Sequence, residues 1–332
     1  MEALIAFNWY RCDIKPNLDL ADHAVMAAKA SGVQRYIASA VWCLCMTYFR
    51  LGSRDTSYNH IQEAYELFNT FPPAEVESHR LVGLCGIDLV DNARILDKDD
   101  SVSLARDVEK KCTALSDDLV HGRSLMGLGD AMIEAQRWQE ALYYLDDART
   151  VFKAVGNAFY LACVYQCIAW VHYHEHRLSD ALDAIEEAWK YTKLTASRYI
   201  QIGIPLDFGK ILFGTNRDAE AWKYIEISLT NASYVGDRQQ VARALNYIGY
   251  GCLRRGEHQN AYGAYEAAAE KYLGTSESSK AWSCKCNMAS IVEKQENPDR
   301  VVGFFRPVLD IDKTFFYPPV QGCASELPIS HS

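Results

Sequence analysis

The chain has 332 residues, of which 49% are hydrophobic and 23% are charged, and its formal net charge is -9. This composition supports a long packed core and excludes an intrinsically disordered chain. The adjacent basic pairs are Lys110-Lys111 and Arg254-Arg255. Two such pairs in an acidic chain do not make the clustered basic surface that follows nucleic-acid phosphates, so we expect no nucleic-acid partner.

The eleven cysteines form an odd set, and several of them fall at expected core positions of helices. This pattern favours reduced thiols in an intracellular protein over a disulfide framework. The N-terminus lacks the basic and long apolar regions of a secretion signal, and no run of apolar residues is long enough to span a membrane. We therefore expect a cytoplasmic protein without a membrane partner.

The first segment predicts two helices, residues 3–11 and 19–31, which Gly32 ends as a C-cap glycine. The end of a solenoid normally needs a polar cap. Here the first helix is apolar, with Leu4, Ile5, Phe7 and Trp9. We interpret this end as a docking surface, with a homodimer through the apolar N-terminal repeat as one possibility and a segment of a larger protein as the other.

The next two units are predicted at residues 34–73 and 77–118. Apolar residues follow the helical period in both, and Pro72-Pro73 separates them. The second of these units diverges most from the pattern that follows.

From residue 121 onward, one helical pattern recurs every forty residues. One position of it is occupied by Ala141, Ala181, Ala221, Ala261 and Val301. Twelve residues before each of these stands a small residue, namely Gly129, Ala169, Gly209, Gly249 and Ala289. A fixed period of about 20 to 50 residues indicates a solenoid, in which each unit buries its apolar face against its neighbours.

We therefore expect one helical repeat array over residues 1–310, followed by a C-terminal tail at 311–332. The repeats are expected near residues 1–33, 34–73, 77–118, 121–157, 158–197, 198–237 and 238–278, with a degenerate last unit at 279–310. Pro307 and Gly303 weaken the second helix of that last unit.

The repeats resemble the tetratricopeptide repeat (TPR) family. The clearest copy is Leu125-x2-Leu128-Gly129-x2-Met132 followed by Ala141-x3-Leu145-x2-Ala148. The period of forty departs from the common period of 34 and is similar to the long-period variant of kinesin light chains and multidomain signalling regulators. The resemblance covers about 300 residues and implies an all-α, right-handed superhelical solenoid of about seven helix-turn-helix repeats.

In this family the first helices of the repeats line a groove that receives a peptide. Projection of the family's groove positions onto this chain selects Trp42, Met46, Arg123, Asp130, Gln166, Trp170, Tyr173, Lys210, Arg243, Asn246, Tyr247 and Tyr250. Aromatic rings beside arginine and amide side chains are suited to peptide recognition. The alternative for each residue is packing between repeats.

The strongest candidate for chemistry is the group formed by Cys163, Cys167, His172 and His176. His172 and His176 could share one face of a helix, but the cysteines lie more than one turn away and His172 falls at an expected core position. We therefore expect no metal site, no cofactor and no catalytic residue.

The sequence thus predicts a non-catalytic scaffold or sensor that binds a protein or peptide ligand in its groove. Two alternatives stay open: a receptor for a short free signalling peptide, and a dimerisation module from a larger signalling protein.

Overall fold

The computed structural model describes residues 14–51, 53–71, 76–96, 100–273, 275 and 279–294. Within these ranges the regular structure is helical throughout, without strands. The chain divides into two compact units, residues Met1–Gly236 and Asp237–Ser332, and each is described by itself. The apolar N-terminal residues 1–13 and the tail at 311–332, with the expectations placed on them, lie outside the described residues.

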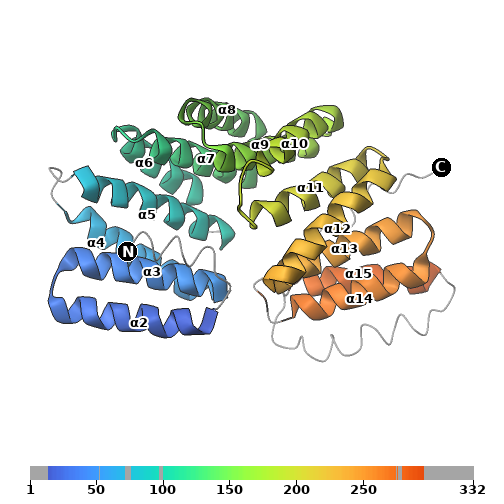
Figure 1. Ribbon diagram of the computed structural model, residues 1–332, viewed down its shortest axis with the longest axis horizontal. Coiled ribbons are helices and arrows are strands. Elements are labelled where there is room, and N and C mark those ends of the chain that lie inside the picture. The colour runs from blue at the N-terminus through green and yellow to red at the C-terminus, as the bar shows by residue number, and fades with distance from the viewer. Residues whose placement is uncertain are drawn as a thin grey trace. The chain divides into compact units, whose positions relative to one another are not determined.

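Consecutive helices of unit 1 pack against one another from α2 to α12 (Figure 1). They are α2 (Ile14–Ser31), α3 (Gln34–Leu51), α4 (Arg54–Asn69), α5 (Val76–Ile95), α6 (Ser101–Thr113), α7 (Asp118–Glu134), α8 (Trp138–Val155), α9 (Ala158–His174), α10 (Leu178–Thr192), α11 (Ile200–Gly214) and α12 (Asp218–Val235). Unit 2 contains α13 (Arg238–Arg254), α14 (His258–Tyr272) and α15 (Ser279–Lys294), packed in the same order. The all-α solenoid expected from the repeat is the observed fold class.

The turns inside the hairpins repeat at the expected interval. Gln136, His176 and Asn216 have φ values of 56°, 59° and 58°, and Gly256 takes the fourth place with φ 73°. Positive φ is uncommon for residues other than glycine. It recurs here because each residue ends a first helix in the left-handed cap conformation.

A backbone hydrogen bond closes each of these turns. The amide of Arg137 donates to the carbonyl of Met132 at 2.8 Å. The same bond joins the equivalent residues of the next three hairpins at 2.9 Å. It satisfies a carbonyl that the end of the helix would otherwise leave without a donor.

Small residues let the two helices of a hairpin approach closely. The alanines Ala141, Ala181, Ala221 and Ala261 are fully buried. Opposite them, a Cβ added at Gly129 would lie 2.8 Å from Cγ of Leu145, which is too short for a normal contact. The repeating small residues are thus required by packing.

The first helices of unit 1 also touch one another. Contacts join α5 to α7, α7 to α9, and α9 to α11. Side chains of these four helices can therefore meet across repeats. Among the described residues, no helix is both long and apolar enough to cross a membrane.

Candidate ligand-binding surface

The first helices of unit 1 bring polar and aromatic side chains together on what we call the α5–α11 surface. Its members are Asp88, Asp91, Arg94, Arg123, Asp130, Gln166, Trp170, Tyr173, Asp207 and Lys210. Six of these residues are projected groove residues, namely Arg123, Asp130, Gln166, Trp170, Tyr173 and Lys210.

Asp88 holds the α5 end of this surface. Its Oδ2 accepts from the indole Nε1 of Trp42 at 2.9 Å, and its Oδ1 accepts from Nη2 of Arg123 at 3.2 Å. The side chain of Asp88 is 12% exposed. Burial raises the pKa of Asp88 to about 6, although Arg123 and the indole act to lower it.

A second group of charges lies beside it. Arg94 donates to Oε1 of Glu134 at 2.9 Å and lies 3.9 Å from Oδ1 of Asp91. Burial raises the pKa values of Asp91 and Asp130 in spite of the opposing effect of Arg94. The thiol of Cys167 on α9 acts to lower the pKa of Asp130, so α9 also contributes to the electrostatics of this group.

Asp207 organises the α11 end. Its Oδ2 accepts from Nε2 of Gln166 at 2.5 Å and from Nε1 of Trp170 at 3.0 Å. Lys210 Nζ lies 4.0 Å from the centroid of the Trp170 ring and 4.6 Å from that of Tyr173, which are cation–π distances. A small cavity of about 10 Å³ remains among these residues, about the space of one water molecule.

An aromatic stack extends this end of the surface. The His174 ring is stacked on Trp170, with centroids 5.1 Å apart and planes inclined by 16°. The ring of His174 is also stacked with that of Trp138, the first residue of α8, with centroids 5.4 Å apart and planes inclined by 3°. Three parallel rings with Lys210 over the last of them form a stiff wall.

The projection placed Trp42 and Met46 on the groove, but the structure buries both, at 4% and 9% exposure. Trp42 turns inward because its indole N–H reaches Asp88 and its ring packs edge-on against Phe68, with centroids 6.0 Å apart. Neither side chain offers surface to a ligand in this structure.

The remaining projected residues lie on α13 of unit 2, where all four are partly exposed. Arg243 donates to Oε1 of Gln240 at 3.2 Å, and Oδ1 of Asn246 accepts from the thiol of Cys284 at 3.5 Å. The hydroxyl of Tyr250 accepts from Arg254 at 3.4 Å, and Tyr247 lies between these residues on the same helix.

Sequence reasoning missed Asp207, His174 and the acidic residues of α5. Asp207 could have been predicted from the sequence, because it stands forty residues before Tyr247 and so shares a projected groove position. Asp88 and Asp91 could not have been predicted in this way, because they belong to the unit that diverges most from the repeat.

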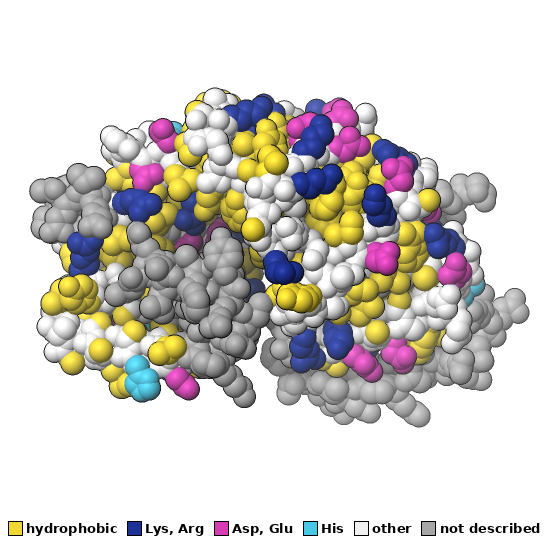
Figure 2. Space-filling model, viewed as in Figure 1, with side chains coloured by type: hydrophobic (Ala, Val, Ile, Leu, Met, Phe, Trp, Pro, Cys, Tyr) yellow, Lys and Arg dark blue, Asp and Glu magenta, His cyan; other side chains and the backbone are white. Residues whose placement is uncertain are grey.

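The charges visible on one face of unit 1 are mixed. Figure 2 shows basic and acidic side chains interspersed with apolar ones where α8 to α10 lie, without one large patch of a single sign. The face visible in Figure 2 thus presents no broad field of one sign.

No protein-family profile matches the chain, and no curated protein matches its sequence. Solved structures do match its fold. A Rap protein complexed with competence and sporulation factor superimposes with a TM-score of 0.63 at 13% identity, over 90% of this chain and 85% of that one. A Rap conjugation gene regulator of the plasmid pLS20, in complex with the Phr* peptide, gives 0.55 at 17% identity, over 85% and 76%.

A third match is a STAND signal-transduction ATPase with a tetratricopeptide repeat sensor from Pyrococcus horikoshii. Its TM-score is 0.63 at 12% identity, over 92% of this chain and 47% of that protein, so this chain spans about half of its length. At such identities the likeness concerns the fold, which is tetratricopeptide-like as the repeat pattern predicted.

Proposed function

We propose that this tetratricopeptide-like chain is a protein-interaction module that holds a segment of a partner protein against the α5–α11 surface. The observation that carries the proposal is the row of charged, amide and aromatic side chains on four first helices that contact one another. All of them are partly exposed except Asp207, which is buried. Packing between repeats would be served better by apolar side chains, because partly buried charges are costly.

The two ends of the surface offer different contacts. Trp170 and Tyr173 supply rigid aromatic area of the kind that dominates binding energy at interfaces. Gln166 and Arg123 supply donors and an acceptor for the backbone of an extended segment. A ligand that lies along α7, α9 and α11 would meet both kinds of group.

The charges indicate the chemistry of the segment. At the α5–α7 end, the carboxylates of Asp88, Asp91 and Asp130 meet the guanidinium groups of Arg94 and Arg123, and Glu134 adds a further negative charge. Burial raises the pKa values of the three aspartates, and only two guanidinium groups face these three carboxylates and that of Glu134. A lysine or arginine of the ligand would relieve this imbalance.

Two of the solved neighbours support a peptide-like ligand, since one was solved with competence and sporulation factor and one with the Phr* peptide. This support is by analogy of fold. The same analogy also supports a second candidate function, a receptor for a short free signalling peptide, which would use the same surface.

The test is selection of peptides from a random phage-displayed library on the full chain, followed by affinity measurements with the selected synthetic peptides. We expect enrichment of peptides that contain a basic residue. Their affinity should fall at least about tenfold in Asp130→Asn and in a Trp170→Ala/Lys210→Ala double variant, which corresponds to about 1.4 kcal/mol.

The control is Tyr143→Ala, which removes a ring that is 63% exposed on α8. It should bind the selected peptides as the wild type does, and circular dichroism should show equal helicity in all variants. Selected peptides that bind every variant equally would place the interaction elsewhere and contradict the proposal. A partner segment and a free peptide are then distinguished by whether the motif gains affinity when it is presented within a folded protein.

A further inference from the structure

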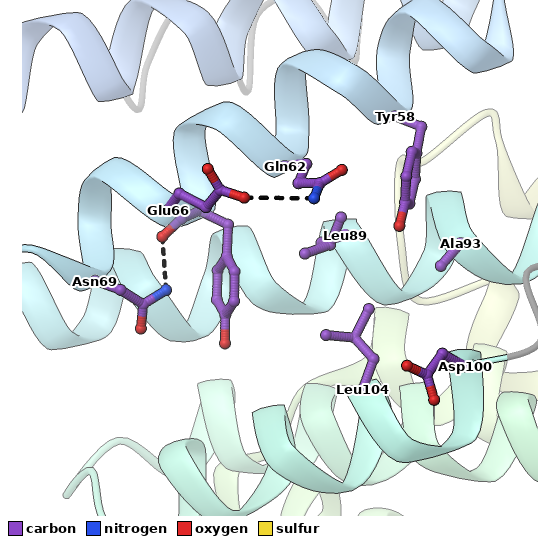
Figure 3. Close-up of a pocket in the computed structure, with 9 residues that line it drawn as sticks. Tyr58, Gln62, Glu66, Asn69, Leu89, Ala93, Asp100 and Leu104 are labelled. Carbon is purple, nitrogen blue, oxygen red and sulfur yellow. Dashed lines mark hydrogen bonds between the residues drawn. The ribbon is translucent and has the colours of Figure 1, made fainter.

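A second hollow lies between the second helices α4 and α6, over the floor formed by α5. Its volume is about 440 Å³, within the range of ligand-binding pockets. Tyr58, Gln62 and Glu66 of α4 line one wall, Leu104 of α6 lines the other, and Leu89 lies in the floor (Figure 3). None of these residues belongs to the α5–α11 surface.

The pocket and the α5–α11 surface use different faces of α5. Leu89 and Ala93 are four residues apart and so share one face of the helix, which points into the pocket. Asp88 and Asp91 are three residues apart and contribute to the other surface. The two sites are therefore independent in their side chains although they share a helix.

The pocket exists because α4 and α6 diverge. Near the C-terminal ends of both helices, Nζ of Lys111 donates to the hydroxyl of Tyr65 and to Oδ1 of Asn69, each at 2.8 Å. Toward their N-terminal ends the helices separate, and Figure 3 shows Tyr58 and Asp100 on opposite sides of the opening. Lys111 thus holds α4 and α6 together at one end of the pocket, and the pocket is open at the other end.

The walls combine an apolar base with an acidic rim. Leu89 and Ala93 are buried in the floor, and Leu104 is half-buried beside them. Glu66 accepts from Nε2 of Gln62 at 3.3 Å, and Figure 3 shows this pair on the α4 side. Asp100 precedes α6, but its side chain makes no capping hydrogen bond to that helix.

An aspartate directly before a helix ordinarily accepts from the first backbone amides, as Asp117 does from Val120 N at 3.0 Å. Asp100 instead borders the pocket. Within the described ranges, neither Glu66 nor Asp100 forms an ion pair with a basic side chain. A ligand with an apolar part and a cation would therefore complement the apolar base and the two carboxylates of this pocket.

We propose that the α4–α6 pocket is a second protein-docking site, and that it takes an arginine of a partner segment together with a neighbouring apolar side chain. The planar guanidinium can donate hydrogen bonds to the carboxylate of Asp100 and lie against the ring of Tyr58, which Figure 3 shows at the same end of the pocket. Glu66, at the other end, adds a second negative charge that attracts the cation. The apolar side chain covers Leu89 and Leu104, whose burial provides the non-directional part of the affinity.

The probe is the tripeptide acetyl-Leu-Arg-Leu-amide, added at millimolar concentration to the full chain with labelled leucine methyl groups. We expect the methyl resonances of Leu89 and Leu104 to shift in a saturable way. The same peptide with citrulline in place of arginine keeps the shape but lacks the charge, and it should bind at least about tenfold more weakly.

Two variants test the pocket itself. Glu66→Gln with Asp100→Asn removes the charges at exposed positions, and Gln62→Trp fills the opening from an exposed position of α4. Both should abolish the saturable shift. The matched control, Glu63→Gln with Asp107→Asn, removes two exposed carboxylates from the same helices outside the pocket and should retain it.

Three results would overturn the proposal: no shift at Leu89 and Leu104, equal binding of the citrulline peptide, or equal loss in the Glu63/Asp107 control. Equal citrulline binding would mean an apolar site without charge recognition. The Trp170→Ala/Lys210→Ala variant should leave this binding unchanged, so failure here and failure of the α5–α11 surface are separate outcomes.

Discussion

The α5–α6 hairpin differs from the three hairpins that follow it, α7–α8, α9–α10 and α11–α12. In those three, the residue before the second helix is an arginine, namely Arg137, Arg177 and Arg217. Each pairs with an acidic residue three positions on, as Arg137 does with Glu140. In the α5–α6 hairpin that place is taken by Asp100, which has no such partner and borders the pocket.

The connections differ as well. The three regular hairpins reverse the chain at a residue in the left-handed conformation, within residues 135–137 and their equivalents. In the α5–α6 hairpin, residues 96–100 separate the two helices. The α4–α6 pocket therefore lies where the repeat is relaxed. Most of the α5–α11 surface, in contrast, lies on the first helices of the regular hairpins, at positions that recur with the repeat.

The largest effect should come from the core of a regular hairpin. Phe152 of α8 is fully buried, and Phe152→Ala should lower the free energy of unfolding by about 3–5 kcal/mol. Leu104→Ala, at the half-buried wall of the pocket, should cost about 1 kcal/mol or less because little surface leaves the core. Urea denaturation of the full chain measures both. Equal losses would contradict the distinction between a packed hairpin and a relaxed one.

The pH dependence of stability should depend on Asp88 of α5. Since the folded protein raises the pKa of Asp88 from 3.8 to about 6, its folded state holds the proton more tightly than the unfolded state. Its contribution to stability is therefore present below the unfolded pKa and is lost as the pH rises through the folded one. Relative to Asp88→Asn, the wild type should lose up to about 3 kcal/mol between pH 4 and pH 7.

Asp117→Asn provides the control of opposite sign. Partial burial acts to raise the pKa of Asp117, but hydrogen bonds from Val120 N and Arg80 outweigh it and the pKa is lowered. The wild type should therefore gain stability over this variant as the pH rises above the pKa of the folded state. Melting temperatures at each pH report both differences. A wild-type curve parallel to that of Asp88→Asn would show that Asp88 is not the group concerned.

The smallest expected effect is on the free energy of unfolding, and it comes from comparing two glycines at close contacts between packed helices. At Gly209 in α11, an added Cβ would lie 2.6 Å from Cγ1 of Ile225 and 3.2 Å from the backbone oxygen of Ala221. Gly209→Ala should therefore destabilise by about 1–3 kcal/mol, despite the better helix propensity of alanine.

At Gly86 in α5, the added Cβ would be 2.9 Å from side-chain atoms of Tyr65 and Val108, and no backbone atom of a neighbouring helix is among its nearest contacts. Gly86→Ala should cost less than about 1 kcal/mol, because the gain in helix propensity offsets the contact. Gly203→Ala is the control, since its nearest neighbour is 3.6 Å away, and it should stabilise slightly. If Gly86→Ala were the more damaging change, the α5–α6 hairpin would be the tighter of the two.

Much of the candidate site could be anticipated from repeat positions. Gln166, Trp170, Tyr173 and Lys210 were projected to share a surface, and the structure brings them together around Asp207. Trp42 shows the limit of such projection. Trp42 takes the repeat position of Gln166 but is buried, because its indole N–H donates to the carboxylate of Asp88, 46 residues further along the chain.

The sequence by itself determined the all-α class and the spacing of the turns, because helix periodicity, small residues at close contacts and left-handed caps are local requirements that recur with every repeat. Only the tertiary structure decided which charged side chains meet and where the helices part. Those features depend on the tilt of one helix against its neighbours, as for α6 beside α4, and no local pattern of residues encodes that tilt.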